Sequence, residues 1–188
     1  MSSRGYSFES EMEDYFLALE GKNKQSPIFD KTGKIARSFR VPTSGMMASM
    51  PGDVLTANPN FPHQFMVECK ARSGKTKKSG QVFRLDMEWV EKNIAESKEA
   101  GYVPLFVLSF KRQKKHRIWA VLDPVAHQIL FNGWLELTPY HCQKKKSFVL
   151  QKSFLDANAD KHFALEPNRI LVTWNSCYER IKQWMPTN

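Results

Sequence analysis

The residues best suited to chemistry lie in two short segments that read as strands, Gly52–Ala57 and Gln64–Ala71. The first segment carries Asp53 near its start, and the second carries Glu68 and Lys70 near its end. Because side chains alternate along a strand, Glu68 and Lys70 point to the same face of the sheet. Paired carboxylates beside an ammonium group are typical of sites that hydrolyse phosphodiesters with the help of a metal ion.

The turn between the two segments predicts which residues face each other. Residues 58–62, Asn-Pro-Asn-Phe-Pro, have the composition of a turn. If the turn is centred on Asn60 and Phe61, Asp53 lies opposite Glu68, and their Cβ atoms are about 5 Å apart on one face. A shift of one residue in the pairing would place them on opposite faces, so the site depends on this register.

Two carboxylates this close repel each other unless a positive charge lies between them. Their oxygen atoms are ligands that suit Mg²⁺ or Mn²⁺. Such an ion polarises a phosphate oxygen and lowers the pKa of a bound water, and Lys70 is placed to stabilise the negative charge that develops. We therefore expect a metal-dependent hydrolase site at Asp53, Glu68 and Lys70. The alternative is a surface salt bridge across the hairpin.

The Glu-x-Lys pattern has little value by itself, because the chain contains it three times. Glu20-Gly21-Lys22 falls at the end of an expected helix and Glu96-Ser97-Lys98 falls inside another. Glu68-Cys69-Lys70 alone follows an apolar strand that is preceded by a strand beginning Gly-Asp. The context therefore singles out this third copy.

The elements around these residues predict an α/β fold, with a mixed central sheet flanked by helices. Apolar residues at helical spacing predict a helix over Ser7–Glu20, and a second, long helix is expected over Arg84–Ala100. The expected strands outside the hairpin are Ala36–Val41, Val103–Phe110, Arg117–Leu122, Ser147–Lys152 and Arg169–Trp174, with the very apolar Val103–Phe110 in the centre and a final helix over Ser176–Met185. We divide the chain into a core, residues 1–131, and a C-terminal extension, residues 132–188, packed on that core.

Composition narrows the class of partner. The 188 residues include 28 Lys and Arg against 19 Asp and Glu, a formal net charge of +9, which favours a polyanion such as DNA. The three cysteines, Cys69, Cys142 and Cys177, are far apart and form no CxxC pair, so neither a zinc site nor a disulfide framework is indicated. The start of the chain lacks an apolar signal core, and no apolar run is long enough to cross a membrane. We expect a cytoplasmic protein without a membrane partner.

With these residues in view, the chain resembles the PD-(D/E)xK nuclease superfamily. Asp53, Glu68 and Lys70 stand where that motif has its two acidic residues and its lysine. The usual proline directly before the aspartate is absent, because Pro51 lies two positions back and Gly52 intervenes. The resemblance implies a restriction-endonuclease-like core and Mg²⁺ or Mn²⁺ as cofactor.

Within that superfamily, the sequence is similar to the archaeal-type Holliday junction resolvases over about residues 4–122. That family begins with a basic residue, a glycine and a helix with a metal-site glutamate, as in Arg4-Gly5-Tyr6-Ser7-Phe8-Glu9. A strand with an arginine and a serine-containing loop then precede the aspartate, as in Arg40-Val41-Pro42-Thr43-Ser44-Gly45. The loop 45–52 is longer than the family pattern, and the part beyond about Phe131 has no counterpart in it.

The resemblance implies roles for further residues. Glu9 would be the third acidic metal ligand, Ser44 would contact the substrate near the scissile phosphate, and Arg4 and Arg40 would bind the DNA backbone. Basic residues that follow the Glu-x-Lys strand would form a DNA track: Arg72, Lys75, Lys77 and Lys78. Glu13, on a similar face of the first helix, is the substitute if Glu9 is not the ligand.

The family acts as a homodimer that makes paired cuts in four-way junctions, and we expect the same here. Two alternatives stay open from the sequence. One is a restriction-type or DNA-repair endonuclease of the same superfamily that acts on linear duplex. The other is a DNA-binding module without catalytic activity, which the intact Asp53, Glu68 and Lys70 disfavour.

Overall fold

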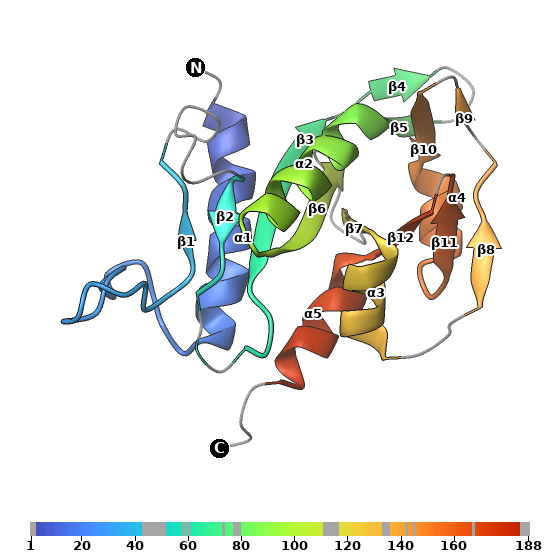
Figure 1. Ribbon diagram of the computed structural model, residues 1–188. Coiled ribbons are helices and arrows are strands. Elements are labelled where there is room, and N and C mark those ends of the chain that lie inside the picture. The colour runs from blue at the N-terminus through green and yellow to red at the C-terminus, as the bar shows by residue number, and fades with distance from the viewer. Residues whose placement is uncertain are drawn as a thin grey trace.

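The computed structural model describes residues 3–42, 52–57, 59, 61–72, 74–76, 80–110, 117–132, 136–141, 143–144, 146–166 and 168–184. In this part of the chain, a mixed eight-stranded sheet forms the centre and a four-stranded sheet adjoins one end (Figure 1). The predicted α/β architecture, a mixed sheet flanked by helices, is confirmed.

The main sheet is built in the order β1 (Phe39–Arg40), β2 (Val54–Leu55), β3 (Phe65–Arg72), β6 (Val103–Phe110), β7 (Ile118–Leu122), β12 (Arg169–Thr173), β11 (His162–Leu165) and β8 (Leu137–Pro139). The small sheet has the order β4 (Gly74–Thr76), β5 (Gly80–Asp86), β10 (Ser147–Gln151) and β9 (Gln143–Lys144). The helices are α1 (Ser3–Leu19), α2 (Met87–Glu99), α3 (Pro124–Phe131), α4 (Lys152–Ala157) and α5 (Trp174–Lys182).

The centre of the main sheet is the pair β3 and β6, which run parallel over their whole length. Parallel neighbours need a long crossover, and here β4, β5 and α2 provide it. The strand predicted over Val103–Phe110 has the observed bounds of β6 and lies between β3 and β7, with all but its first residue buried. This central position accounts for its nearly continuous apolar sequence.

Several predicted boundaries differ from the observed ones. The first helix begins at Ser3 rather than Ser7, and β1 and β2 are shorter than predicted, covering only Phe39–Arg40 and Val54–Leu55. The long helix was expected to begin at Arg84, but residues 84–86 belong to β5, and α2 begins at Met87. Phe83 and Leu85 are both fully buried, the two-residue period of a strand, and β5 pairs with β10. The helix starts where the Asp86 carboxylate accepts a hydrogen bond from the backbone N–H of Glu88.

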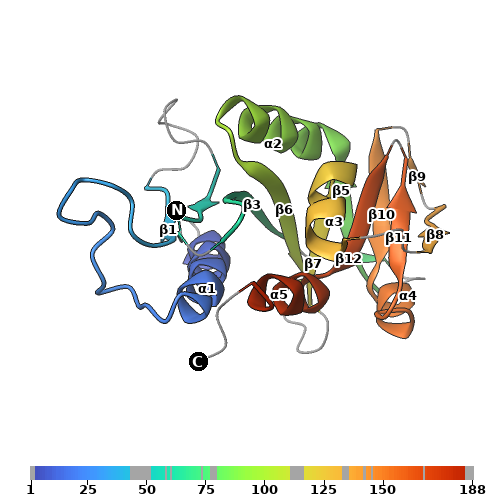
Figure 2. The same ribbon diagram turned by 60° about the horizontal axis from the view of Figure 1, so that its bottom comes forward.

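Helices cover both faces of the main sheet (Figure 2). One apolar cluster joins α1, α3 and α5 to one face, through residues such as Met12, Val67 and Val107. The other joins α2 and the small sheet to the opposite face, through Val90, Phe106 and Leu108. Neighbouring residues of β6 therefore contribute to opposite cores, as strand alternation requires.

The C-terminal residues continue the main sheet. The predicted strands at 147–152 and 169–174 appear as β10 and β12, and β12 pairs directly with β7. The final helix, predicted over 176–185, is α5 and begins earlier, at Trp174. Beyond residue 131 the chain thus adds β12, β11 and β8 after β7 in the strand order of the main sheet, whereas β2 and β3, which carry the candidate site, lie toward its opposite edge. In the parts of the chain that the structure describes, no helix combines the length and apolar character needed to cross a bilayer.

Candidate active site

The hairpin of β2 and β3 has the register predicted from its turn. Val54 pairs with Val67 and Leu55 with Met66, and the backbone N–H of Asp53 donates to the carbonyl of Val67 at 2.8 Å. Asp53 directly precedes β2, so the strand pairing ends at Val54 and Val67. The Asp53 charge raises the pKa values of both Glu68 and Lys70, which places its carboxylate close to these two side chains.

Asp53 is fixed in place by its neighbours. Its side chain is almost fully buried, and Oδ2 accepts a hydrogen bond from the backbone N–H of Cys69 at 2.7 Å. Gly52 before it has a φ of +85°, and a Cβ atom at this position would lie 2.6 Å from Cγ of Met66. The close approach of the two strands thus demands glycine where the superfamily motif usually has proline.

Glu68 and Lys70 form an ion pair between Oε1 and Nζ on the same face of β3. Burial raises the pKa of Glu68, and the Asp53 charge raises it further, while Lys70 acts in the opposite direction. For Lys70, burial is the largest single effect and lowers the pKa, but the charge and hydrogen bond of Glu68 together with the Asp53 charge outweigh it, and the net shift is upward. Lys70 therefore stays cationic at neutral pH, between two acidic groups.

Glu9 joins this group from α1. Its carboxyl is half-buried, and burial and the Asp53 charge raise its pKa, as does Glu68 more weakly. Arg40, at the end of β1, and Lys70 lower it. Mutual effects of this kind require that the charges lie within a short distance of each other. The structure thus places Glu9 in one electrostatic cluster with Asp53, Glu68 and Lys70.

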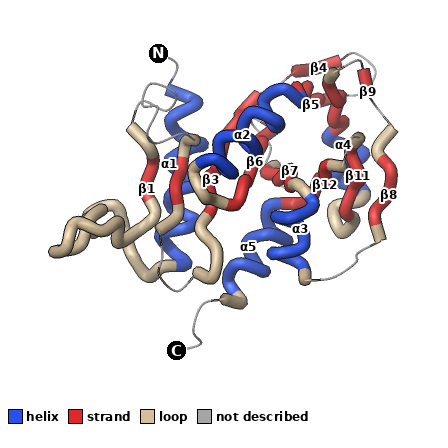
Figure 3. Tube along the Cα trace, viewed as in Figure 1, coloured by secondary structure: helices blue, strands red, loops and turns tan. Residues whose placement is uncertain are grey.

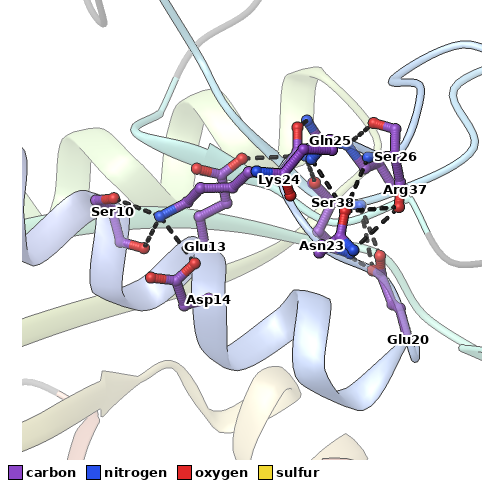
Figure 4. Close-up of polar contacts among 10 residues, drawn as sticks. All are labelled: Ser10, Glu13, Asp14, Glu20, Asn23, Lys24, Gln25, Ser26, Arg37 and Ser38. Atoms are coloured by element: carbon purple, nitrogen blue, oxygen red, sulfur yellow. Dashed lines mark hydrogen bonds and ion pairs between the residues drawn. The ribbon is translucent and has the colours of Figure 1, made fainter.

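Glu13, the alternative to Glu9 as a metal ligand, is already paired with an arginine. Its carboxylate forms a buried ion pair with Arg37 at 3.0 Å. The Arg37 guanidinium also donates to the backbone carbonyls of Ser26 and Ser38, each at 2.7 Å. Figure 4 shows these contacts, which hold the long loop between α1 and β1, tan in Figure 3, against the helix. A carboxylate engaged in this way is poorly placed to bind a metal ion.

The donor set suits a hard divalent cation in kind, because carboxylate oxygens are the ligands that Mg²⁺ and Mn²⁺ prefer. The raised pKa values of Glu9 and Glu68 show that their negative charges are under-compensated, which a cation would correct. Within the described ranges no three acidic, histidine or cysteine side chains already stand at ligand positions. The assignment of Glu9, Asp53 and Glu68 as a metal-binding set stays a prediction.

The other predicted site residues are less fully placed. The exposed Arg72 ends β3 and its guanidinium lies 4.3 Å from the ring centre of Trp89 in α2, a neighbour that the sequence did not reveal. Arg4 belongs to α1 and Lys75 to β4, and only their backbone is described. Ser44, Lys77 and Lys78 lie outside the described residues.

The small sheet gathers basic segments that are distant in the sequence. Lys75 lies in β4, the exposed Arg84 in β5, Lys144 in β9, and the exposed Lys146 directly precedes β10. β4 follows β3 after one residue, so this sheet continues from the end of the strand that bears Lys70 and Arg72. Lys144 belongs to the same small sheet as Lys75, and Lys146 lies at its margin, directly before β10 (Figure 1).

The family described as "Phage putative PDDEXK endonuclease" matches residues 2–160. The solved structure of Hjc, a Holliday junction resolvase from the archaeal hyperthermophile Archaeoglobus fulgidus, is similar over 79% of this chain and 89% of its own, with 17% sequence identity and a TM-score of 0.43. No curated protein matches the sequence. The family match spans most of the chain and includes all four residues of the charged cluster.

Proposed function

This chain belongs to the phage PDDEXK endonuclease family, and we propose that it is a Mg²⁺- or Mn²⁺-dependent endonuclease that resolves four-way DNA junctions. The observation that carries the nuclease assignment is the charged cluster at the β2–β3 hairpin, in which the Asp53 charge acts on Glu68 and Lys70 and these two side chains form an ion pair. Lys70 supplies the positive charge beside these carboxylates, and it lies on β3 together with Glu68.

The side chains then have distinct tasks. Asp53, Glu68 and Glu9 hold the ion, and the Cys69 N–H fixes the orientation of Asp53. A divalent cation bound there supplies a polarised phosphate oxygen and a water of lowered pKa. Water adds to phosphorus, one P–O ester bond breaks, and the leaving oxygen takes up a proton. Lys70, cationic at neutral pH, stabilises the negative charge on the phosphate oxygens as this happens.

The choice of a junction as substrate rests on the sequence pattern around this site. The Arg4–Glu9 segment and the Arg40–Gly45 segment follow the order found in archaeal-type junction resolvases. The basic residues of β3 and of the small sheet offer contacts to DNA backbone, and such contacts position a duplex without reading its sequence. A homodimer with two such sites would make the paired cuts that resolve a junction.

The experiment compares a mobile four-way junction with linear duplex of equal length, in Mg²⁺, Mn²⁺ and EDTA. We expect metal-dependent paired nicks in the junction and little cleavage of the duplex. Asp53→Asn and Glu68→Gln should each abolish cleavage, and Lys70→Ala should leave only a trace of it, while all three variants retain junction binding in a gel-shift assay. Preferential cleavage of linear duplex would assign the protein to the restriction or repair type instead. Absence of cleavage with both metals would identify a binding module.

A further inference from the structure

Two buried polar side chains of α2 stand out among the described residues. Asn93 is 2% exposed, and neither atom of its side-chain amide has a hydrogen-bond partner in this part of the chain. Ser97, fully buried one turn later, has an unpartnered Oγ. Burial of unpaired polar groups costs stability, so an amide kept in such a place calls for an explanation.

The contacts of α2 show which way Asn93 faces. Glu91 pairs with Arg169 of β12, and Lys98 pairs with Asp123 after β7, so this side of the helix faces the far strands. On the opposite side of the helix, the Trp89 ring lies against the Arg72 guanidinium of β3. The negative charge of Glu96, on the same side, raises the pKa of Glu68, which is also on β3. Asn93 follows Trp89 by four residues and precedes Glu96 by three, so the three form one stripe along the helix. This stripe faces β3.

The same contacts give the level of Asn93 along the strand. From Trp89 to Glu96 the helix rises about 10 Å, and from Arg72 back to Glu68 the strand advances about 13 Å. The two segments therefore run alongside each other (Figures 1 and 2). Asn93 lies midway along its stripe and Lys70 midway along the strand segment. The buried amide is thus level with the Lys70 side chain, on the face that also carries Glu68.

We propose that Asn93 is a positioning residue of this nuclease: its side-chain oxygen accepts a hydrogen bond from the Lys70 ammonium when the Glu68 carboxylate turns to a divalent cation. The inference rests on the proposed function. In the structure Lys70 is paired with Glu68, and a carboxylate that serves as a metal ligand is a weaker partner for a lysine. Lys70 has a flexible four-carbon stem, so it needs a second acceptor to stay directed at the phosphate.

The test uses Asn93→Leu, which keeps the number and branching of side-chain heavy atoms but removes both polar ones. We expect junction cleavage to slow about 10- to 100-fold, the range found for groups that orient metal-site residues, with most of the loss in kcat and little change in KM. The unfolding midpoint in EDTA should stay the same or rise, because an unpaired buried amide is removed. The rise in midpoint on adding Mg²⁺ should persist, since Asn93 is not a ligand.

Two controls separate this role from a structural one. Ser97→Ala removes the other unpartnered polar atom of the helix and should leave cleavage unchanged. In a Lys70→Met background, Asn93→Leu should cause no further loss of residual cleavage, because it acts through Lys70.

Three results would overturn the inference while the proposed function stands: wild-type cleavage by Asn93→Leu, a lowered midpoint in EDTA that accounts for the lost activity, or an equal loss with and without Lys70. If the wild-type protein itself cuts no DNA in Mg²⁺ or Mn²⁺, the proposed function fails first, and the role of Asn93 fails with it.

Discussion

Asp53→Asn tests the electrostatic reasoning most directly, because it removes one charge and no heavy atom. The asparagine side-chain oxygen can still accept the hydrogen bond that the Cys69 N–H donates to Asp53 at 2.7 Å. The backbone around the site, including Gly52 at φ +85°, needs no adjustment. Any change in stability therefore reports the charge on residue 53 and its net effect on Glu68, Glu9 and Lys70.

The size of the effect follows from three contributions. Two unit charges about 5 Å apart repel by about 3 kcal/mol at an effective dielectric constant of about 20. Against this, a hydrogen bond to a charged acceptor is about 1 kcal/mol stronger than one to a neutral amide. The variant also loses the attraction between Asp53 and Lys70, about 1 kcal/mol. The metal-free variant should thus be more stable by about 1 kcal/mol. For a chain of this size, that raises the unfolding midpoint by about 2–4 °C.

The assay is thermal unfolding at pH 7 in EDTA and again in excess Mg²⁺. We expect Asp53→Asn to raise the midpoint in EDTA and to abolish the further rise that Mg²⁺ gives the wild type. Asp14→Asn is the matched control, because Asp14 is exposed and pairs with Lys24 at 2.8 Å, and its change should be within about 0.5 kcal/mol. A lower midpoint for Asp53→Asn in EDTA, or a full response to Mg²⁺, would refute the clustered-carboxylate reasoning.

Three further predictions concern the same site. Glu9→Gln should abolish metal-dependent cleavage in a folded protein. Glu13→Gln should instead leave Arg37 buried without its charge partner and lower the free energy of unfolding by about 3–5 kcal/mol, with normal cleavage by the folded fraction. Activity assays and denaturant titrations of both variants distinguish the two carboxylates. Burial, with the Asp53 charge, raises the pKa of Glu9 and Glu68 above the ordinary value of 4.5 for a glutamate, so the folded state binds these protons more tightly than the unfolded state. Their contribution to metal-free stability should therefore decline as pH rises from the unfolded-state pKa through the raised pKa values of the folded state, while Mg²⁺ affinity increases over the same pH range. Chemical denaturation measures the stability and calorimetry measures the Mg²⁺ affinity. If stability and affinity changed in the same direction with pH, the assignment would be contradicted. If Arg72 contacts one phosphate, Arg72→Ala should reduce the slope of log affinity against log salt concentration by about 1. Fluorescence anisotropy on a junction at several salt concentrations measures this slope. An unchanged slope would show that Arg72 does not contact the DNA backbone.

Local patterns predicted the part of the site that local structure creates. The pairing of Val54 with Val67 and of Leu55 with Met66 is the one that the turn composition predicted. β6 followed from its continuous apolar sequence, which suits a strand buried on both faces. The shared face of Glu68 and Lys70 followed from alternation alone. The roles of these residues stay predictions, but their mutual arrangement needed no tertiary information.

Tertiary contacts decided the rest. Glu9 and Glu13 looked equivalent on one acidic helix, and only Arg37, from a distant loop, engages Glu13 and leaves Glu9 to the cluster. The start of α2 was misplaced because the β5 sequence is compatible with a helix until its pairing with β10 is known. β8 pairs with β11, a neighbour more than twenty residues away, and is exposed or only partly buried, so it carries no apolar pattern that would reveal a strand.

The C-terminal part of the chain has a physical connection to the candidate site through aromatic packing. Trp174 of α5 lies 5.7 Å from Tyr15 and 5.8 Å from Phe16, measured between ring centroids, and both of these belong to α1. Phe16 in turn lies 6.4 Å from Phe65, the first residue of β3, the strand that bears Glu68 and Lys70. Glu9 is on α1, whereas Glu68 and Lys70 are on β3, so the distance between these charges depends on how α1 sits on the sheet. Because α5 packs on α1 and follows directly from β12, residues beyond 131 help to set the geometry of a cluster to which they contribute no charge.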